Sequence, residues 1–277
     1  MSLNEKMKIN FEAYGVTIGI DFHEPFEFEK ILKIVKNAIP INLNLINNLE
    51  TNTDTEHIFK IRSESENQFS LQKNVEEKTR LNDEQKLLES LESNLRLTIG
   101  EHAKSKVFIH AGVVELGGSA IIIPALSFKG KTSLVVELIK AGATYYSDEY
   151  AIVDEKGLVY PFPKSLSVRG IIDKYTQLER PVDFYGGKKG ENPIRAGLIL
   201  ITEYQIGSHW KPQILSQGEA VLELISNTLP IRNKPEFTLG VLNKLANDAY
   251  AIKTKRGEAK RFAKNLLEYY KMKILQQ

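Results

Sequence analysis

The stretch PALSFKGKTSL, residues 124–134, decides the fold of this 277-residue chain. It contains the second half of the phosphate-loop pattern G-x-x-x-x-G-K-[ST], supplied by Gly130, Lys131 and Thr132. In that pattern the lysine reaches the outer phosphates of a nucleotide and the hydroxyl ligates Mg²⁺. Ala125 stands at the first glycine position, and Phe128 lies inside the loop where small residues are usual. The stretch therefore predicts a phosphate cradle with two departures, and the alternative is a helix start whose lysine points into solvent.

The residues on either side of the stretch predict a strand before it and a helix after it. SAIII, residues 119–123, is a continuous apolar run suited to a strand that is buried on both faces. It follows a second strand at 106–116 through the hairpin turn Gly117-Gly118. Apolar residues recur at helical spacing over 131–143, up to a stop at Gly142. This strand, loop and helix order would direct backbone N–H groups and the helix dipole at a phosphate.

Two adjacent carboxylates follow the loop at a spacing that favours phosphoryl transfer. Asp148 and Glu149 come after Lys131, at the exit of a single strand predicted over 144–154. A phosphoryl transferase uses one carboxylate on the Mg²⁺ side and another to accept the proton of the attacking hydroxyl. Neighbouring strand residues point to opposite sides, so the two would have different roles. The pair alone would be interpreted as a polar strand end, and it is the spacing from Lys131 that favours an active site.

His110, on the strand that precedes the loop strand, is a third candidate. Its imidazole could polarise the transferring group or tune the base. A histidine among Val107, Phe108 and Ile109 is as well explained as a satisfied structural residue. Arg169 and Arg195 could hold phosphates, and surface ion pairing explains each of them equally well.

The run HAGVVELGGSAIIIPALSFKGKTSLVVELIKAGATYYSDEYAIVD, residues 110–154, resembles the catalytic core of the HPr kinase/phosphorylase family and its smaller serine-kinase relatives. A histidine, a phosphate loop and an acidic pair follow one another in that family at the separations seen here. PFPKSLSVR, residues 161–169, resembles a stretch common in the smaller relatives. The resemblance covers residues 104–172 and is only a similar rhythm of strands and helices past 195.

The resemblance implies an α/β fold with a P-loop kinase core of the HPr kinase / phosphoenolpyruvate carboxykinase type. It implies ATP and Mg²⁺ as cofactors and the serine of a protein or peptide as acceptor, although HPr itself is not the expected acceptor. Asp148 would be the general base, supported by His110, and Glu149 and Thr132 would hold Mg²⁺. Nucleotide phosphates would be bound by the loop residues Ser127, Gly130, Lys131, Thr132 and Ser133. The alternative is a catalytically inactive relative that binds a nucleotide or a partner, which Phe128 favours, and the family allows a homo-oligomer.

The rest of the chain divides into three predicted parts. Residues 1–81 form a small β-rich domain, because polar and apolar residues alternate over 8–22, 57–65 and 68–72. Residues 82–103 form a linking helix that starts with a capping box at Asn82 and Gln85. Residues 104–277 form the kinase-like domain, with further strands at 158–169, 194–205 and 249–254 and helices at 218–228, 237–248 and 257–275. The glycine- and lysine-rich segment 183–193 is the best candidate for a mobile loop.

Composition excludes several classes of protein. The chain has no cysteine, so it has no disulfide framework and no thiolate metal site or nucleophile. A formal charge of +2 is too small to indicate a nucleic-acid partner. No apolar run approaches the roughly 20 residues of a membrane span, and the N-terminus lacks an apolar signal core. We therefore expect a cytoplasmic protein, and interpret the basic C-terminal helix as an amphipathic helix packed on the core.

Overall fold

The computed structural model describes residues 6–46, 55–125, 130–169 and 177–274. It divides the chain into two compact units, Met1–Ser105 and Lys106–Gln277. The α/β class is confirmed, since the described residues form six α-helices and several sheets. None of these helices is both long enough and apolar enough to cross a membrane.

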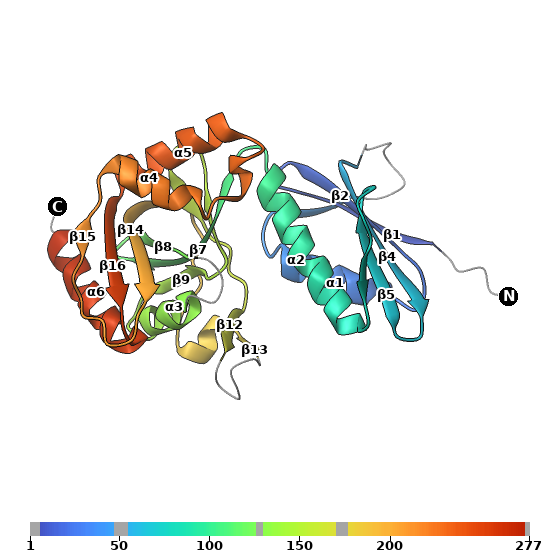
Figure 1. Ribbon diagram of the computed structural model, residues 1–277, viewed down its shortest axis with the longest axis horizontal. Coiled ribbons are helices and arrows are strands. Elements are labelled where there is room, and N and C mark those ends of the chain that lie inside the picture. Colours follow the sequence, from blue (N-terminus) through green and yellow to red (C-terminus); the bar gives the residue numbers. More distant parts are fainter. Residues whose placement is uncertain (1–5, 47–54, 126–129, 170–176, 275–277) are drawn as a thin grey trace. The chain divides into compact units, whose positions relative to one another are not determined.

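The first unit is a six-stranded sheet with two helices on one face (Figure 1). Its strand order is β3-β1-β2-β4-β5-β6, in which β2 and β4 are parallel and the other neighbours are antiparallel. The strands are β1 (Met7–Ala13), β2 (Val16–Phe22), β3 (Leu43–Ile46), β4 (His57–Ser65), β5 (Gln68–Lys73) and β6 (Thr79–Leu81). The helices are α1 (Phe28–Ala38) and α2 (Glu84–His102). The strands predicted over 8–22, 57–65 and 68–72 are thus confirmed.

Helix α1 was not predicted from the sequence. Its buried residues Ile31, Leu32, Val35 and Ala38 repeat at helical spacing, so the signal is present. The predicted capping box at Asn82 and Gln85 was wrong, because α2 begins one residue later than expected. Asp83, and not Asn82, is the N-cap, and its carboxylate accepts a hydrogen bond of 2.9 Å from the Lys86 N–H.

The second unit is built on an eight-stranded mixed sheet. Its order is β11-β10-β7-β8-β14-β16-β15, and β9 also pairs with β7. The strands of this sheet are β7 (Val107–Leu116), β8 (Ser119–Pro124), β9 (Thr144–Ser147), β10 (Tyr150–Val153), β11 (Leu158–Tyr160), β14 (Ile194–Tyr204), β15 (Gln213–Ile214) and β16 (Tyr250–Arg256). A separate hairpin pairs β12 (Leu166–Arg169) with β13 (Gln177–Arg180). Strands β8, β14 and β16 are parallel, so their carboxyl ends share one edge of the sheet.

Helices cover both faces of this sheet (Figure 1). On one face α3 (Lys131–Lys140) and α6 (Ala259–Lys273) pack on a core that includes Ile121, Ile123, Leu198 and Leu200. On the other face α4 (Gln217–Ile225) and α5 (Pro235–Asp248) pack on a core that includes Ile122 and Ile199. Two short 3₁₀ helices, η1 (Val182–Tyr185) and η2 (Leu229–Ile231), complete the unit. The alternation along β8 and β14 shows why a continuous apolar run is needed: successive side chains enter opposite cores.

The sequence interpretation of 144–154 as a single strand was wrong. The chain forms β9, bends at Asp148 and Glu149, and continues as β10, and both strands pair with β7. The bend is stabilised by the buried Ser147 hydroxyl, which accepts hydrogen bonds of 3.0 Å from the Glu149 N–H and 2.9 Å from the Tyr150 N–H. Such a hydroxyl competes with the sheet ladder for backbone donors, and alternation of side chains does not reveal it.

The segment 183–193 is anchored to the sheet by its backbone. The backbone N–H of Tyr145 donates to the Lys188 carbonyl at 2.8 Å, and the backbone N–H of Gly190 donates to the Tyr145 carbonyl at 2.7 Å. A side chain on Gly190 would collide with the Tyr146 ring, so glycine here permits a close approach. This segment therefore fixes both the N–H and the carbonyl of Tyr145, whose hydroxyl belongs to the site described below.

Candidate functional site

The N-terminus of α3 presents a buried lysine. Gly130, the N-cap of α3, has the left-handed conformation with φ of 74°, which glycine adopts without strain. Lys131 follows with only 8% of its surface exposed. Among the described residues its Nζ atom has no hydrogen-bond partner. A buried ammonium group is costly unless it is paired, so this arrangement is typical of a site that receives an anion.

Gly112 on β7 sets the position of the Lys131 side chain. A Cβ atom at this glycine would lie 2.6 Å from Val135 Cγ2 and 3.1 Å from Lys131 Cγ. The absence of a side chain therefore lets α3 pack closely on β7, with the stem of Lys131 lying across the strand. The charge of Lys131 interacts with both carboxylates of the acidic bend, Asp148 and Glu149.

Asp148 is buried at that bend and contacts three elements of the unit. Its Oδ2 lies 3.3 Å from the Thr132 hydroxyl, which donates to it, and its Oδ1 lies 3.0 Å from the Tyr145 hydroxyl. The backbone of Ser167 also hydrogen-bonds to the carboxyl group. The Tyr145 hydroxyl lies 2.8 Å from the Lys164 carbonyl, which can only accept. The Tyr145 hydroxyl has one hydrogen, so it can donate to only one of these two oxygens. Both bonds are made at once when Asp148 carries a proton, because the protonated carboxyl group then donates to Tyr145.

The pKa values of Asp148 and Lys131 are both shifted toward neutral pH, that of Asp148 upward and that of Lys131 downward. Burial, aided by the charge of Glu149, raises the pKa of Asp148 to about 6, although Lys131 opposes the shift. Burial lowers the pKa of Lys131 to about 8, although Glu149 and Asp148 oppose that shift. The three charges therefore act on one another, and the sequence-predicted residues Lys131, Thr132, Asp148 and Glu149 lie together.

His110 lies on β7 directly beside the acidic bend. Its register partner is Tyr150, whose ring it meets edge-on with the centroids 5.8 Å apart. The next residue on β7, Ala111, donates to the Glu149 carbonyl at 3.1 Å. The His110 N–H donates to the Asn227 carbonyl at 2.7 Å, and its carbonyl accepts from Ala125 at 3.3 Å. The backbones of His110 and Ala111 thus join Ala125 to the acidic bend.

Arg256 is a site residue that was not predicted from the sequence. It is the last residue of β16, it is 3% exposed, and its guanidinium group lies against Gly130, where any side chain would collide with it. The Tyr204 ring also contacts it, with the guanidinium carbon 5.5 Å from the ring centroid. Because the strand was expected to end at Thr254, the arginine fell outside it. The tendency of ligands to bind at the carboxyl ends of parallel strands is the signal that could have identified Arg256.

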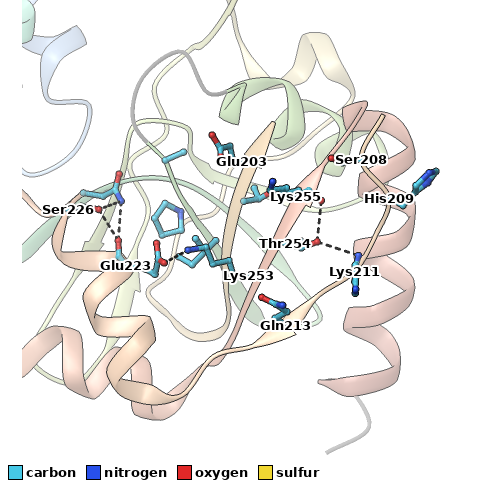
Figure 2. Close-up of a pocket in the computed structure, with 15 residues that line it drawn as sticks. Glu203, Ser208, His209, Lys211, Gln213, Glu223, Ser226, Lys253, Thr254 and Lys255 are labelled. Carbon is cyan, nitrogen blue, oxygen red and sulfur yellow. Dashed lines mark hydrogen bonds and ion pairs between the residues drawn. The ribbon is translucent and has the colours of Figure 1, made fainter. Parts of the chain in front are cut away.

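A pocket of 540 Å³ opens at the carboxyl ends of β8, β14 and β16 (Figure 2). The ends of these strands contribute Pro124, Ala125, Ile201, Thr202, Glu203, Lys253, Thr254 and Lys255. The end of α4 contributes Glu223, the two residues that follow α4 contribute Ser226 and Asn227, and the chain around β15 contributes Ser208, His209, Lys211 and Gln213. In Figure 2, Lys253 extends to Glu223, with which it forms a salt bridge of 2.5 Å.

The remaining candidates are placed as follows. Ser133 lies in the first turn of α3 and is exposed. Ser127 and Phe128 fall outside the described residues, as does the side chain of Arg169. Arg195 is near the amino end of β14, where it interacts with Asp248, so it lies at the opposite edge of the sheet from the loop. Of the two explanations of Arg195, this position favours ion pairing.

The described part of the chain contains no cluster of three or more histidine or acidic side chains arranged to hold a metal ion. Mg²⁺ bound with a nucleotide needs only one or two protein ligands, because water and phosphate oxygens supply the others. Thr132 and the carboxylates of the bend fit that requirement. Comparison with family models and with curated proteins finds no match to this chain.

Proposed function

We propose that this protein is an ATP-dependent phosphotransferase of the HPr-kinase-like type, with a P-loop kinase core formed by residues 106–277. It transfers the terminal phosphoryl group of ATP to a serine or another hydroxyl of a protein or peptide. The observation that carries the proposal is the buried ammonium group of Lys131 at the start of α3, which has no hydrogen-bond partner within residues 6–46, 55–125, 130–169 and 177–274. The guanidinium group of Arg256 and the carboxyl group of Asp148 flank the same turn.

The electrostatics of the turn favour a polyphosphate. Two buried cations, Lys131 and Arg256, lie where the helix dipole also attracts negative charge. An anion that enters this turn pairs with both cations and offsets the desolvation that now lowers the pKa of Lys131. Preorganised cations of this kind also stabilise the charge that develops on a transferring phosphoryl group.

The acidic bend supplies the remaining chemistry. Asp148, with its pKa near 6, accepts the proton of the acceptor hydroxyl as that oxygen bonds to the γ-phosphorus and ADP leaves. His110 supports the bend from β7. Thr132 and Glu149 would hold Mg²⁺, which neutralises phosphate charge when it is bound.

A second candidate is a catalytically inactive relative that binds a nucleotide or a protein partner. Ala125, at the first glycine position, favours it, because this residue is buried and lacks the backbone freedom of glycine. Such a protein could bind nucleotide at Lys131 and yet transfer nothing.

Labelled transfer to peptides separates these candidates. The full chain is incubated with Mg²⁺, ATP labelled at the γ-phosphate and an array of serine- and threonine-containing peptides. The natural protein should label a subset of peptides, Asp148→Asn should bind ATP and lose transfer by at least 100-fold, and Lys131→Ala should lose both. Transfer by Lys131→Ala at the natural rate would refute the proposal. Lysine-dependent binding without transfer to any peptide would support the inactive relative instead.

A further inference from the structure

The pocket beside the loop has a composition that differs from the phosphate-binding turn. Its walls include the apolar side chains of Pro124 and Ile201. At one end the charges of Lys253 and Glu223 neutralise each other across 2.5 Å. Lys255 and Glu203 add one charge of each sign, and Lys211 leaves one positive charge in excess. A pocket with apolar walls and largely balanced charge suits an uncharged ring system better than a phosphate group, and 540 Å³ falls within the roughly 300–1,000 Å³ of small-molecule sites.

Two of the residues that line the pocket carry polar atoms without a hydrogen-bond partner in the part of the chain that the structure describes. Asn227 Oδ1 and Thr202 Oγ1 are buried, and neither has a hydrogen-bond partner among the described residues. Asn227 is otherwise fixed, since its Nδ2 donates to the Glu223 carbonyl at 3.2 Å and to the Ser226 hydroxyl at 3.1 Å. An amide oxygen and a hydroxyl held in this way are suited to orienting a ligand that carries N–H or O–H groups.

The strands of the sheet connect this pocket to the phosphate-binding turn. Lys253 and Lys255 on β16 line the pocket, whereas the next residue, Arg256, reaches Gly130. Ala125, the last described residue before the loop, lines the pocket as well. Both sites therefore lie at the same edge of the sheet, on either side of one strand end.

We infer that this pocket binds the nucleoside portion, base and ribose, of the nucleotide whose phosphates are bound by Lys131 and Arg256. The inference rests on the proposed function, because it requires a phosphate site at the start of α3. The base lies between the apolar walls, and its polar edge faces Asn227 and Thr202. The pocket then determines that a nucleotide, and not a simple polyphosphate, is the preferred phosphate donor.

Two probes distinguish this inference from the proposed function. Inorganic tripolyphosphate with Mg²⁺ can occupy only the phosphate site, whereas ADP with Mg²⁺ would occupy both sites. Ser226→Trp places an indole in the pocket from an exposed position directly after α4, and Leu222→Trp places one on α4 itself, outside the pocket. Calorimetric titration of both probes into the natural full chain and the two variants gives the affinities.

The inference predicts that Ser226→Trp weakens ADP binding by at least tenfold and changes tripolyphosphate binding by less than twofold. Leu222→Trp should leave both affinities unchanged. Retained tripolyphosphate binding also shows that Ser226→Trp is folded. Natural ADP affinity in Ser226→Trp would overturn the pocket assignment while leaving the phosphate site intact. A natural protein that binds neither probe would refute the proposed function and the pocket together.

Discussion

Lys131 and Asp148 are charged at neutral pH in an environment that disfavours both charges. Burial is the main cause in each case, and the residues oppose each other's shift only in part. Binding sites commonly retain such strain, because groups that are prepared for a ligand are unsatisfied without one. The free protein should therefore be less stable than its packing would allow.

Replacing the lysine should make the free protein more stable. The pKa of Lys131 falls from 10.5 to about 8 on folding, so the folded state binds fewer protons between these values and stability rises with pH across that window. At pH 7 the full cost of the buried charge is present. Lys131→Met should raise the free energy of unfolding at pH 7 by about 1–3 kcal/mol and remove the rise between pH 8 and 10. Lys140→Met, at an exposed position of the same helix, is the control in urea unfolding. A less stable Lys131→Met would contradict this account.

The pH dependence of transfer should have two limbs. Below about pH 6 Asp148 becomes protonated and can no longer accept a proton, and above about pH 8 Lys131 loses the charge that attracts phosphate. A plot of kcat/KM against pH should therefore be bell-shaped with limbs near 6 and 8. An acid limb near pH 4 would mean that an ordinary, exposed carboxylate is the base.

At the scale of elements, close packing of α3 on β7 sets the position of Lys131. A methyl group at Gly112 would lie too near Val135 Cγ2, at 2.6 Å, and would force the helix away from the strand. Gly112→Ala should lower the free energy of unfolding by about 1–3 kcal/mol and weaken nucleotide binding. Gly240→Ala on α5 is the matched control, because its Cβ would meet nothing within 4 Å, and it should be neutral or slightly stabilising. Thermal unfolding and ADP titration of both variants test this, and equal behaviour would contradict it.

Local patterns in the sequence were enough to predict the elements around the loop. The apolar run of β8, the hairpin at Gly117-Gly118 and the stripe of α3 all depend on neighbours in the chain. The bend at Asp148 could not be predicted from alternation, because it depends on the Ser147 hydroxyl taking two backbone donors. Arg256 lies more than a hundred residues from Gly130 in the chain, and only the pairing of β8, β14 and β16 brings the two together. Roles for Asp148, Glu149 and His110 remain predictions.

At the scale of the molecule, the second unit contains every described residue of the site. Its two cores are formed by residues 107–274 alone, and the pocket and the acidic bend belong to the same unit. We predict that residues 106–277 fold without the first unit and bind ADP within about threefold of the full chain. Circular dichroism and titration of that fragment test the prediction. A folded fragment without affinity would show that the first unit is needed for binding.

The central claim is that Lys131 is the cation of a working nucleotide site. The most direct test is calorimetric titration of ATP with Mg²⁺ into the natural full chain, Lys131→Ala and the control Lys140→Ala. The account predicts micromolar binding to the natural protein and to Lys140→Ala, with affinity reduced by at least tenfold in Lys131→Ala. The absence of binding to the natural protein, or equal affinity in Lys131→Ala, would contradict it.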